Sequence, residues 1–297
     1  MTQVVTLSAP ERAAVAAALA EDVATDDVTT RALVPPGAHG AAEIRAKAPG
    51  VVAGIAVAAE VFRQVDPSVR FEALAADGDV VSAGHVVVRV EGRLVALLEA
   101  ERTAVNFLQR MSGIATLTAQ FVAAVRGTGV RILATRKTAP VLRPFDLAAV
   151  RAGGGGVHRE SLAAAVLVKE NHVRAARAAR TAESMPAVVA RVLAAAAAAD
   201  PRPGVGIEAA DLDELRAALV PGVDVLLLDN FTPEQCVEGV CLRAAAFPAG
   251  GGPELEASGG ITLANVAACA RTGVERISVG ALTHSAPALD LSMRVLA

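Results

Sequence analysis

The sequence predicts an α/β protein in which a small α+β region precedes a set of parallel strands joined by helices. Three observations lead to this prediction. Beyond about residue 130, a short β-branched run, a polar or glycine-rich end and a helical stretch follow one another six times. These runs are apolar throughout, as in strands buried on both faces of a barrel or a doubly wound sheet. Between about residues 41 and 92, apolar and polar residues instead alternate, as they do in half-buried strands.

The N-terminal region opens with a predicted helix. Ser8 and Glu11 have the spacing of a capping box, and the helix they start runs through an alanine-rich stretch to about Ala20. No basic region followed by an apolar stretch precedes it, so we expect no signal peptide. Strands are then expected at 41–48, 68–74 and 85–92.

Around Leu97 the apolar residues return to three- and four-residue steps, which predicts a second long helix, interrupted near Ser112 and Gly113. We place the domain boundary there. The expected domains are residues 1–113 and a barrel domain of residues 114–297 that ends in a C-terminal helix.

Six apolar runs with their polar ends define the predicted parallel strands. They are VRILA before Thr135, Arg136 and Lys137; AAVLV before Lys169; VGI before Glu208; VDVLLL before Asp229; LEA before Ser258, Gly259 and Gly260; and RISV before Gly280. Thr232 and Thr262 are expected to cap the helices that follow two of these strands. Residues 185–199 have high helix propensity and are expected on the outer ring.

Composition narrows the range of functions. The net charge is −3 and the pI about 6.0, with basic and acidic residues interleaved, so no nucleic-acid surface is expected. No segment has the roughly 20 strongly apolar residues of a membrane span. The three cysteines show no metal-ligand spacing, which favours a reducing cytoplasm. With no Trp or Tyr, recognition must rely on charge and backbone rather than on aromatic stacking.

In parallel barrels, side chains at the carboxyl ends of the strands surround one mouth. Arg136, Lys137 and Lys169 bring positive charge there, and His158 and Arg159 follow a run of four glycines at 153–156. Any one of these charges alone is more simply explained by a structural ion pair. Together they exceed the two carboxylates at the same ends, and an uncompensated charge is costly unless a ligand neutralises it. The sequence therefore predicts a ligand with several negative groups.

The remaining strand-end residues suit a phosphorylated ligand. Glu208 and Asp229 can hold ribose hydroxyls or a hydrated Mg²⁺, or can act as general acid and base. The glycine-containing ends of the last two strands, Ser258 to Gly260 and Val279 to Ala281, are typical of phosphate loops assisted by a helix N-terminus. We expect His172 to orient its loop and His284 to be structural.

Several strings resemble, in order and spacing, the signature segments of the quinolinate phosphoribosyltransferases, also called carboxylating nicotinate-nucleotide diphosphorylases. They are EDVATDDVTT, AERTAVNFLQRMSGIAT, TRKTAP, GGGGVHRESL, AVLVKENH, VLLLDNF, EASGGIT and ISVGALTHS. The resemblance covers nearly the whole chain. It implies an incomplete parallel α/β (TIM-like) barrel with an N-terminal α/β sandwich domain, and a homodimer in which Arg102 reaches into the partner's site.

The resemblance also implies roles for the site residues. Thr135, Arg136, Lys137, His158, Arg159 and Lys169 would bind the carboxylates of quinolinate and the phosphates of phosphoribosyl diphosphate. Glu208 and Asp229 would serve the ribose hydroxyls and Mg²⁺, and Ser258, Gly259, Gly260, Val279, Gly280 and Ala281 the 5′-phosphate. Lys137, Lys169, Glu208 and Asp229 would be catalytic, in a reaction that yields nicotinate mononucleotide, diphosphate and CO₂ for NAD biosynthesis.

Several positions depart from the pattern usual in that family. They are Val141 where Gly is typical, Leu147 and Ala148 where Lys-Tyr is frequent, Val157 where Asn precedes the His-Arg pair, Glu170 where Asp is commoner, and Gly206 where an acid is usual. None removes a charge assigned to substrate contact.

Three alternatives remain open. The acceptor could be nicotinate or another pyridine acid. Lys169 could instead form a Schiff base, as in an aldolase. Residues 77–92 also resemble the half-barrel of lipoyl and biotinyl carriers, but they lack the lysine such a carrier needs.

Overall fold

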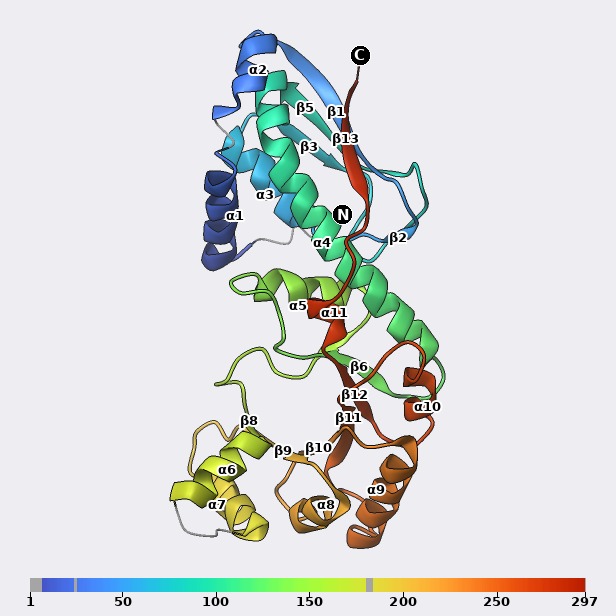
Figure 1. Ribbon diagram of the computed structural model, residues 1–297. Helices are drawn as coiled ribbons and strands as arrows, with labels where there is room; N and C mark the ends of the chain where they lie inside the picture. Colours follow the sequence, from blue (N-terminus) through green and yellow to red (C-terminus); the bar gives the residue numbers. More distant parts are fainter. Residues whose placement is uncertain (1–6, 24–25, 180–183, 297) are drawn as a thin grey trace. The chain divides into compact units, whose positions relative to one another are not determined.

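A computed structural model describes residues 7–23, 26–179 and 184–296. Ala24 and Thr25, within the string at 21–30, lie outside the described residues. The chain forms two compact units (Figure 1). The N-terminal unit comprises Met1–Ala119, Lys137–Gly155 and Leu282–Ala297, and the parallel-sheet unit comprises Gln120–Arg136 and Gly156–Ala281.

The N-terminal unit is built on a four-stranded antiparallel sheet with the order β13-β1-β5-β3. Its strands are β1 (His39–Ala46), β3 (Arg70–Ala73), β5 (Val86–Arg93) and β13 (Leu291–Leu296). A separate two-stranded ribbon pairs β2 (Gly50–Val51) with β4 (Val80–Val81). The three strands predicted between residues 41 and 92 are therefore confirmed.

The C-terminal segment corrects the sequence prediction. A helix was expected at the end of the barrel domain, but residues 291–296 form β13, which pairs antiparallel with β1 in the N-terminal sheet. Leu291, Met293 and Val295 alternate with Ser292 and Arg294, and this period of two suits a strand that is half buried. The expected C-terminal helix is wrong.

The helices that pack in the N-terminal unit begin with α1 (Ala9–Glu21), where the Ser8 and Glu11 capping box is present as predicted. The others are α2 (Val28–Leu33), α3 (Ile55–Val65) and α5 (Arg143–Ala152). Helix α4 (Leu94–Ala124) begins in this unit, and the short helix α11 (Ala281–His284) ends in it. Arg110 on α4 pairs in a two-pronged contact with the fully buried Asp146 on α5, at 2.9 and 2.8 Å.

Helix α4 runs without the break expected at Ser112 and Gly113. The Ser112 hydroxyl accepts from the Ala53 N–H at 3.0 Å, so this polar residue is satisfied inside the core. A Cβ at Gly113 would lie 2.1 Å from the Pro287 carbonyl oxygen. These two residues therefore serve close packing and do not end a helix.

The parallel-sheet unit contains a seven-stranded sheet with the order β7-β6-β12-β11-β10-β9-β8. Its strands are β6 (Arg131–Ala134), β7 (Gly156–Val157), β8 (Ala165–Val168), β9 (Gly204–Ala209), β10 (Val225–Asp229), β11 (Glu254–Ser258) and β12 (Arg276–Val279). All six predicted strands are present and parallel. The sheet has open ends at β7 and β8 within the described residues, so it forms an incomplete barrel.

Helices cover the outer face of this sheet, as Figure 1 shows for α8, α9 and α10 beside β9 to β12. They are α6 (Glu170–Ala179), α7 (Met185–Ala197), α8 (Leu212–Ala218), α9 (Pro233–Ala246) and α10 (Val266–Ala270). Thr232 caps α9 as predicted. Thr262 does not cap a helix, because α10 begins only after Asn265 and is five residues long. No helix in the described part of the chain has the length and apolarity that a membrane span requires.

Candidate active site

The strand register decides which side chains line the inside of the half-barrel. Glu208 pairs with Leu227, and Leu227 with Glu256, so these three side chains share one face of the sheet. Residues of the opposite parity, such as Ile207, Leu228 and Ile277, are fully buried under the outer helices. The polar and charged side chains of these strands therefore belong to the inner face. The inner set comprises Thr135, His158, Lys169, Glu208, Asp229, Glu256, Ser258, Arg276 and Ser278.

Lys169 and Glu208 meet at the ends of β8 and β9. The Lys169 ammonium donates to the Glu208 carboxylate at 3.0 Å, and the lysine side chain remains 47% exposed. The Lys169 backbone N–H donates to Nδ1 of His172 at 2.9 Å, a contact consistent with the expected role of His172 in orienting this loop. A charged, accessible lysine held by a carboxylate suits anion binding better than Schiff-base formation, which needs an unprotonated amine.

Asp229 ends β10 beside the glycine loop of β11. Asn230 has a positive φ of 57°, donates from Nδ2 to Asp229 at 3.0 Å, and donates its backbone N–H to the Ser258 carbonyl at 2.8 Å. Gly259 has φ +85°, and a Cβ there would lie 2.2 Å from Oδ1 of Asn230. This loop therefore requires glycine both for its backbone angle and for the close approach of Asn230.

The residues at the end of the last strand, β12, differ in their exposure. Val279 is 1% exposed and faces the outer helices, so only its backbone is open to a ligand. Gly280 and Ala281 follow it and are partly exposed. The four-residue helix α11 begins at Ala281, directly after this loop, whereas α10, which follows the loop of β11, begins only after Asn265.

His158 and Arg159 follow β7 and are both largely buried. The His158 backbone N–H donates to the Ala134 carbonyl at 3.1 Å, and Arg159 donates to the Ala165 carbonyl at 2.9 Å. Burial, reinforced by the charges of Arg276, Arg159 and Lys169, lowers the pKa of His158 to about 4. His158 is therefore neutral at pH 7 in the absence of a bound anion.

Thr135 and Arg136 follow β6 in the same unit. The Nε atom of Arg136 is buried and finds no hydrogen-bond partner within the described residues. Arg136 also lies close enough to Arg159 to lower the pKa of Arg159, after the larger effect of burial. A buried cationic N–H without a partner next to a second guanidinium is the arrangement expected where an anion binds.

Two inner-face residues have no counterpart among the residues predicted from the sequence. Glu256 is fully buried on β11, and Arg276 lies opposite it on the neighbouring strand β12. Nε of Arg276 is 2.8 Å from Oε2 of Glu256. The inner-face position of Glu256 was predictable from the sequence, because Glu256 lies two residues before Ser258 in the same strand and the two side chains share a face. With these two included, Arg136, Arg159, Lys169 and Arg276 sit with three carboxylates and a neutral histidine. Four cations against three carboxylates leave a positive excess of one among these side chains, and Lys137, which the prediction counted, lies in the other unit.

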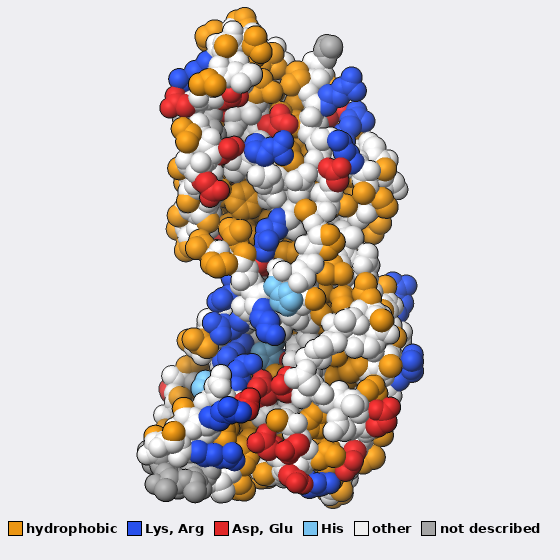
Figure 2. Space-filling model, viewed as in Figure 1, with side chains coloured by type: hydrophobic (Ala, Val, Ile, Leu, Met, Phe, Trp, Pro, Cys, Tyr) orange, Lys and Arg blue, Asp and Glu red, His pale blue; other side chains and the backbone are white. Residues whose placement is uncertain are grey.

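The space-filling view agrees with this arrangement. Figure 2 shows Lys, Arg and His side chains gathered beside acidic ones over the part of the parallel-sheet unit where β8 and β9 lie. Among the described residues no group of three or more His, Cys, Asp or Glu side chains could hold a metal ion.

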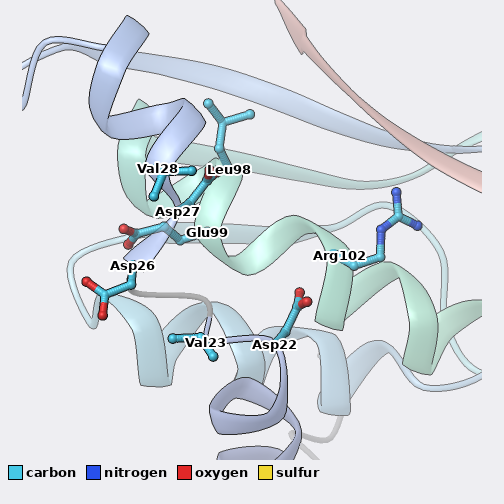
Figure 3. A pocket seen from close by; sticks show the side chains of 8 residues that line it. All are labelled: Asp22, Val23, Asp26, Asp27, Val28, Leu98, Glu99 and Arg102. Carbon is cyan, nitrogen blue, oxygen red and sulfur yellow. The ribbon is translucent and has the colours of Figure 1, made fainter.

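Arg102 and Lys137 belong to the N-terminal unit. The Lys137 carbonyl accepts from the Thr283 hydroxyl at 2.8 Å, and its side chain is exposed. Arg102 lines a pocket of about 330 Å³ between α2 and α4, shown in Figure 3. The other lining residues are Asp22, Val23, Asp26, Asp27, Val28, Leu98 and Glu99. No carboxylate in the described ranges forms an ion pair with Arg102, whose side chain is exposed.

Comparison with known proteins identifies the family. The model of the quinolinate phosphoribosyl transferase N-terminal domain matches residues 27–112, and the model of the C-terminal domain matches residues 114–294. The chain belongs to the quinolinate phosphoribosyltransferase family. It is 38% identical over 283 residues to a probable carboxylating nicotinate-nucleotide pyrophosphorylase of Synechocystis, in a match that covers 94% of this chain and 90% of that protein.

Other family members agree. The carboxylating nicotinate-nucleotide pyrophosphorylase of Mycobacterium leprae is 39% identical over 269 residues, covering 90% of each chain. The solved structure of the Francisella tularensis nicotinate-nucleotide pyrophosphorylase covers 100% of both chains, with a TM-score of 0.87 and 33% identity. A human nicotinic acid phosphoribosyltransferase shares only the fold, with a TM-score of 0.63 at 15% identity over 98% of this chain and 74% of that one.

The departures from the family pattern fall in distinct environments. Val141 is 81% exposed and has φ +66°, a backbone region that a β-branched residue rarely adopts. Leu147 is buried within α5. Gly206 belongs to the inner face, where an added Cβ would lie 3.1 Å from Cδ1 of Leu167. Of these, only Val141 carries a clear energetic cost.

Proposed function

We propose that this chain transfers the phosphoribosyl group of phosphoribosyl diphosphate to the nitrogen of quinolinate and releases CO₂, giving nicotinate mononucleotide and diphosphate. Membership of the quinolinate phosphoribosyltransferase family supports this activity. The structural observation that carries it is the half-barrel, where Lys169 and Arg276 on the inner face accompany the carboxylates of β9, β10 and β11, and Arg136 and Arg159 follow β6 and β7. Such a surface suits a dicarboxylate together with a diphosphate.

In this proposal the cations bind the acidic substrates. Arg136, whose buried Nε lacks a partner among the described residues, grips a carboxylate or phosphate, together with Arg159. Lys169 remains exposed enough to exchange Glu208 for a substrate oxygen. The backbone of residues 258–260 and 279–281 takes the 5′-phosphate, because its glycines allow a close approach.

The carboxylates serve the sugar. As the bond from C1 to diphosphate weakens, the ribose carbon becomes cation-like, and nearby negative charge from Glu208 and Asp229 stabilises it. The pyridine nitrogen then bonds to C1 without any protein nucleophile. The positive charge of the resulting quaternary nitrogen stabilises the electron pair left on the ring carbon when CO₂ departs, and that carbon then takes a proton from water. The cationic pocket therefore needs only to hold the ring in place.

The residues fit Mg²⁺ when it arrives with its substrate. Glu208 and Asp229 provide two carboxylates on neighbouring strands, and Mg²⁺ commonly uses one or two carboxylates plus phosphate oxygens and water. The same donor set is too small to hold the ion alone. When bound, the ion would neutralise charge on the departing diphosphate.

We further propose a homodimer in which Arg102 completes the partner's site. Arg102 is exposed and has no ion pair among the described residues, and Val23 and Val28 in the same pocket are 58% and 78% exposed. Aliphatic side chains left in water around a free guanidinium favour burial by a second copy.

Three free cysteines support a reducing, cytoplasmic location.

The activity is tested by incubating the protein with phosphoribosyl diphosphate, Mg²⁺ and either quinolinate or nicotinate, and by following diphosphate and CO₂. We expect equal amounts of both products with quinolinate and no reaction with nicotinate. Lys169→Ala should reduce kcat/KM by about a hundredfold or more, since one charge-assisted contact is lost and Glu208 is left unpaired. Lys47→Ala, on an exposed lysine of the N-terminal unit, is the matched control. Diphosphate release with nicotinate alone would refute the choice of acceptor.

Site sharing has its own test. Arg102→Ala and Lys169→Ala should each be strongly impaired as homodimers, whereas a mixture that exchanges subunits should regain activity. Each mixed dimer can assemble one intact site from the two undamaged residues. Absence of recovery, with subunit exchange verified by differential labelling, would contradict a shared site.

A further inference from the structure

The segment that carries Lys137 belongs to no helix or strand, so its position depends on contacts from other elements. The hydroxyl of Thr283, on α11, donates to the Lys137 carbonyl at 2.8 Å. The Ala139 N–H donates to Oδ2 of Asp146, on α5, at 3.1 Å. Thr283 and Asp146 are both buried, whereas Lys137 is exposed. The backbone is therefore held at residues 137 and 139 while the lysine side chain remains accessible.

Arg110 on α4 connects the two side chains that hold this segment. Its Nε and Nη2 atoms donate to the two oxygens of Asp146 at 2.9 and 2.8 Å, and Nη2 also donates to the Thr283 carbonyl at 3.5 Å. A buried ion pair adds little net stability compared with apolar side chains of similar volume, but it can fix a single arrangement of the groups around it. Here those groups include the backbone beside Lys137.

The Thr283 hydroxyl also joins two points at which the chain enters the N-terminal unit. Lys137 is the first residue after one entry, and Thr283 is the second residue after the other. Arg136, which precedes the first entry, has the buried Nε described above, and Ala281, which precedes the second, ends the proposed phosphate loop. One hydrogen bond thus links two segments to which substrate contacts are assigned.

We propose that Arg110, Asp146 and Thr283 form a clamp that positions Lys137: by holding the backbone at residues 137 and 139, they present the Lys137 ammonium to an acidic substrate. The proposal rests on the function proposed above and adds positioning residues to its site. A lysine side chain has several rotatable bonds, and ordering it around an anion costs conformational entropy. When its backbone is already fixed, only the side chain remains to be ordered, so the contact forms at a smaller entropic cost.

A double-mutant cycle tests the clamp. Thr283→Val replaces the hydroxyl with a methyl group of similar size, and it should lower kcat/KM for quinolinate about three- to tenfold, as for the loss of one hydrogen bond. In a Lys137→Ala background the same substitution should change kcat/KM by less than about twofold, because the group that Thr283 positions is absent. An equal effect in both backgrounds would overturn the proposal, since Thr283 would then act through another group, such as the phosphate loop that ends at Ala281.

Binding measurements provide the same cycle without turnover. Calorimetric titration gives the dissociation constants of quinolinate, and of phosphoribosyl diphosphate with Mg²⁺, for the wild type, both single variants and the double variant. The ligand whose dissociation constant rises in Lys137→Ala is the one that this lysine contacts. Thr283→Val should weaken the same ligand about three- to tenfold and leave the other within about twofold. A Lys137→Ala variant with normal affinities and normal kcat/KM would contradict the clamp outright.

Two control variants separate positioning from stability. Thr118, buried on α4, donates its hydroxyl to the Ile114 carbonyl at 2.8 Å. Thr118→Val should lower the free energy of unfolding in urea about as much as Thr283→Val does, yet leave kcat/KM within about twofold of the wild type. Thr283→Ser keeps the hydroxyl and should also stay within about twofold. A loss of kcat/KM in either control as large as that in Thr283→Val would refute the role of the Thr283 hydrogen bond.

The outcomes distinguish the clamp from the function on which it rests. Intact turnover of quinolinate without coupling between Thr283 and Lys137 refutes the clamp alone. Absence of turnover in the wild type, with either ligand still bound, refutes the proposed function, and the dissociation constants then decide on the clamp. A wild-type protein that binds neither ligand refutes both.

Discussion

Replacement of Val141 by Gly should stabilise the N-terminal unit. Val141 has φ +66° in the loop that follows Lys137, and a left-handed backbone costs an L-residue about 1–2 kcal/mol, with β-branched residues the most disfavoured. Because the side chain is 81% exposed, its removal sacrifices almost no buried surface. The backbone strain is therefore the main folded-state contribution that the substitution changes.

The opposing contribution comes from the unfolded chain, in which glycine has more conformational freedom, at a cost of roughly 0.5–1 kcal/mol on folding. The difference predicts a net gain of about 0.5–1 kcal/mol in the free energy of unfolding. Val80 on β4 provides a matched control, since it is 80% exposed but has a negative φ. Val80→Gly releases no strain and should destabilise by about 0.5–1 kcal/mol.

Urea unfolding followed by circular dichroism measures both variants, with the slope of free energy against urea checked for constancy. The reasoning requires opposite signs for the two substitutions. If Val141→Gly destabilises the protein as much as Val80→Gly does, the left-handed conformation at residue 141 is not strained and the argument fails.

Three further predictions concern buried polar contacts and backbone constraints. Asp146→Asn should lower the free energy of unfolding by about 3 kcal/mol in urea, because it leaves Arg110 without its buried counter-charge; a loss below about 0.5 kcal/mol would contradict this. Gly259→Ala should abolish activity while lowering the free energy of unfolding less severely, since the added Cβ would lie 2.2 Å from the Asn230 amide oxygen in the proposed phosphate loop. A near-normal kcat/KM would refute the role of that loop. The pKa of Asp66 is lowered to about 2, chiefly by the Ser68 hydroxyl. Asp66→Asn should therefore destabilise at pH 7, and the difference from wild type should disappear as the pH falls from about 4 towards 2, whereas a difference that persists at pH 2 would exclude this ionisation as its cause.

The parallel strands were predictable because each carries its own local signal. Apolar runs such as 225–228 end in a polar residue, and the carboxyl ends of parallel strands lie on one edge, so Lys169, Glu208 and Asp229 could be placed together from the sequence alone. Glu256 and Arg276 were not predicted because they lie deeper in the sheet, away from the strand ends. Their pairing follows from the register of β11 and β12, which the sequence does not state.

A distant contact and an adjacent turn account for two other errors. Ser112 and Gly113 are residue types that often end helices, yet α4 continues through them. The Pro287 backbone packs so closely against Gly113 that no side chain fits there. Thr262 has the composition of a cap, but the turn closed by Asn265 delays α10. In each case a local preference was overruled by a partner distant in sequence or by an adjacent turn.

The pairing of β13 with β1 bears on how the protein is made. Strand β1 is translated early, but one of its two neighbours consists of residues 291–296. The ribosome therefore releases the entire parallel-sheet unit before the N-terminal sheet can acquire its final edge strand, and until then β1 presents an unpaired edge. The sheet whose first strand is synthesised early is thus the last to be completed.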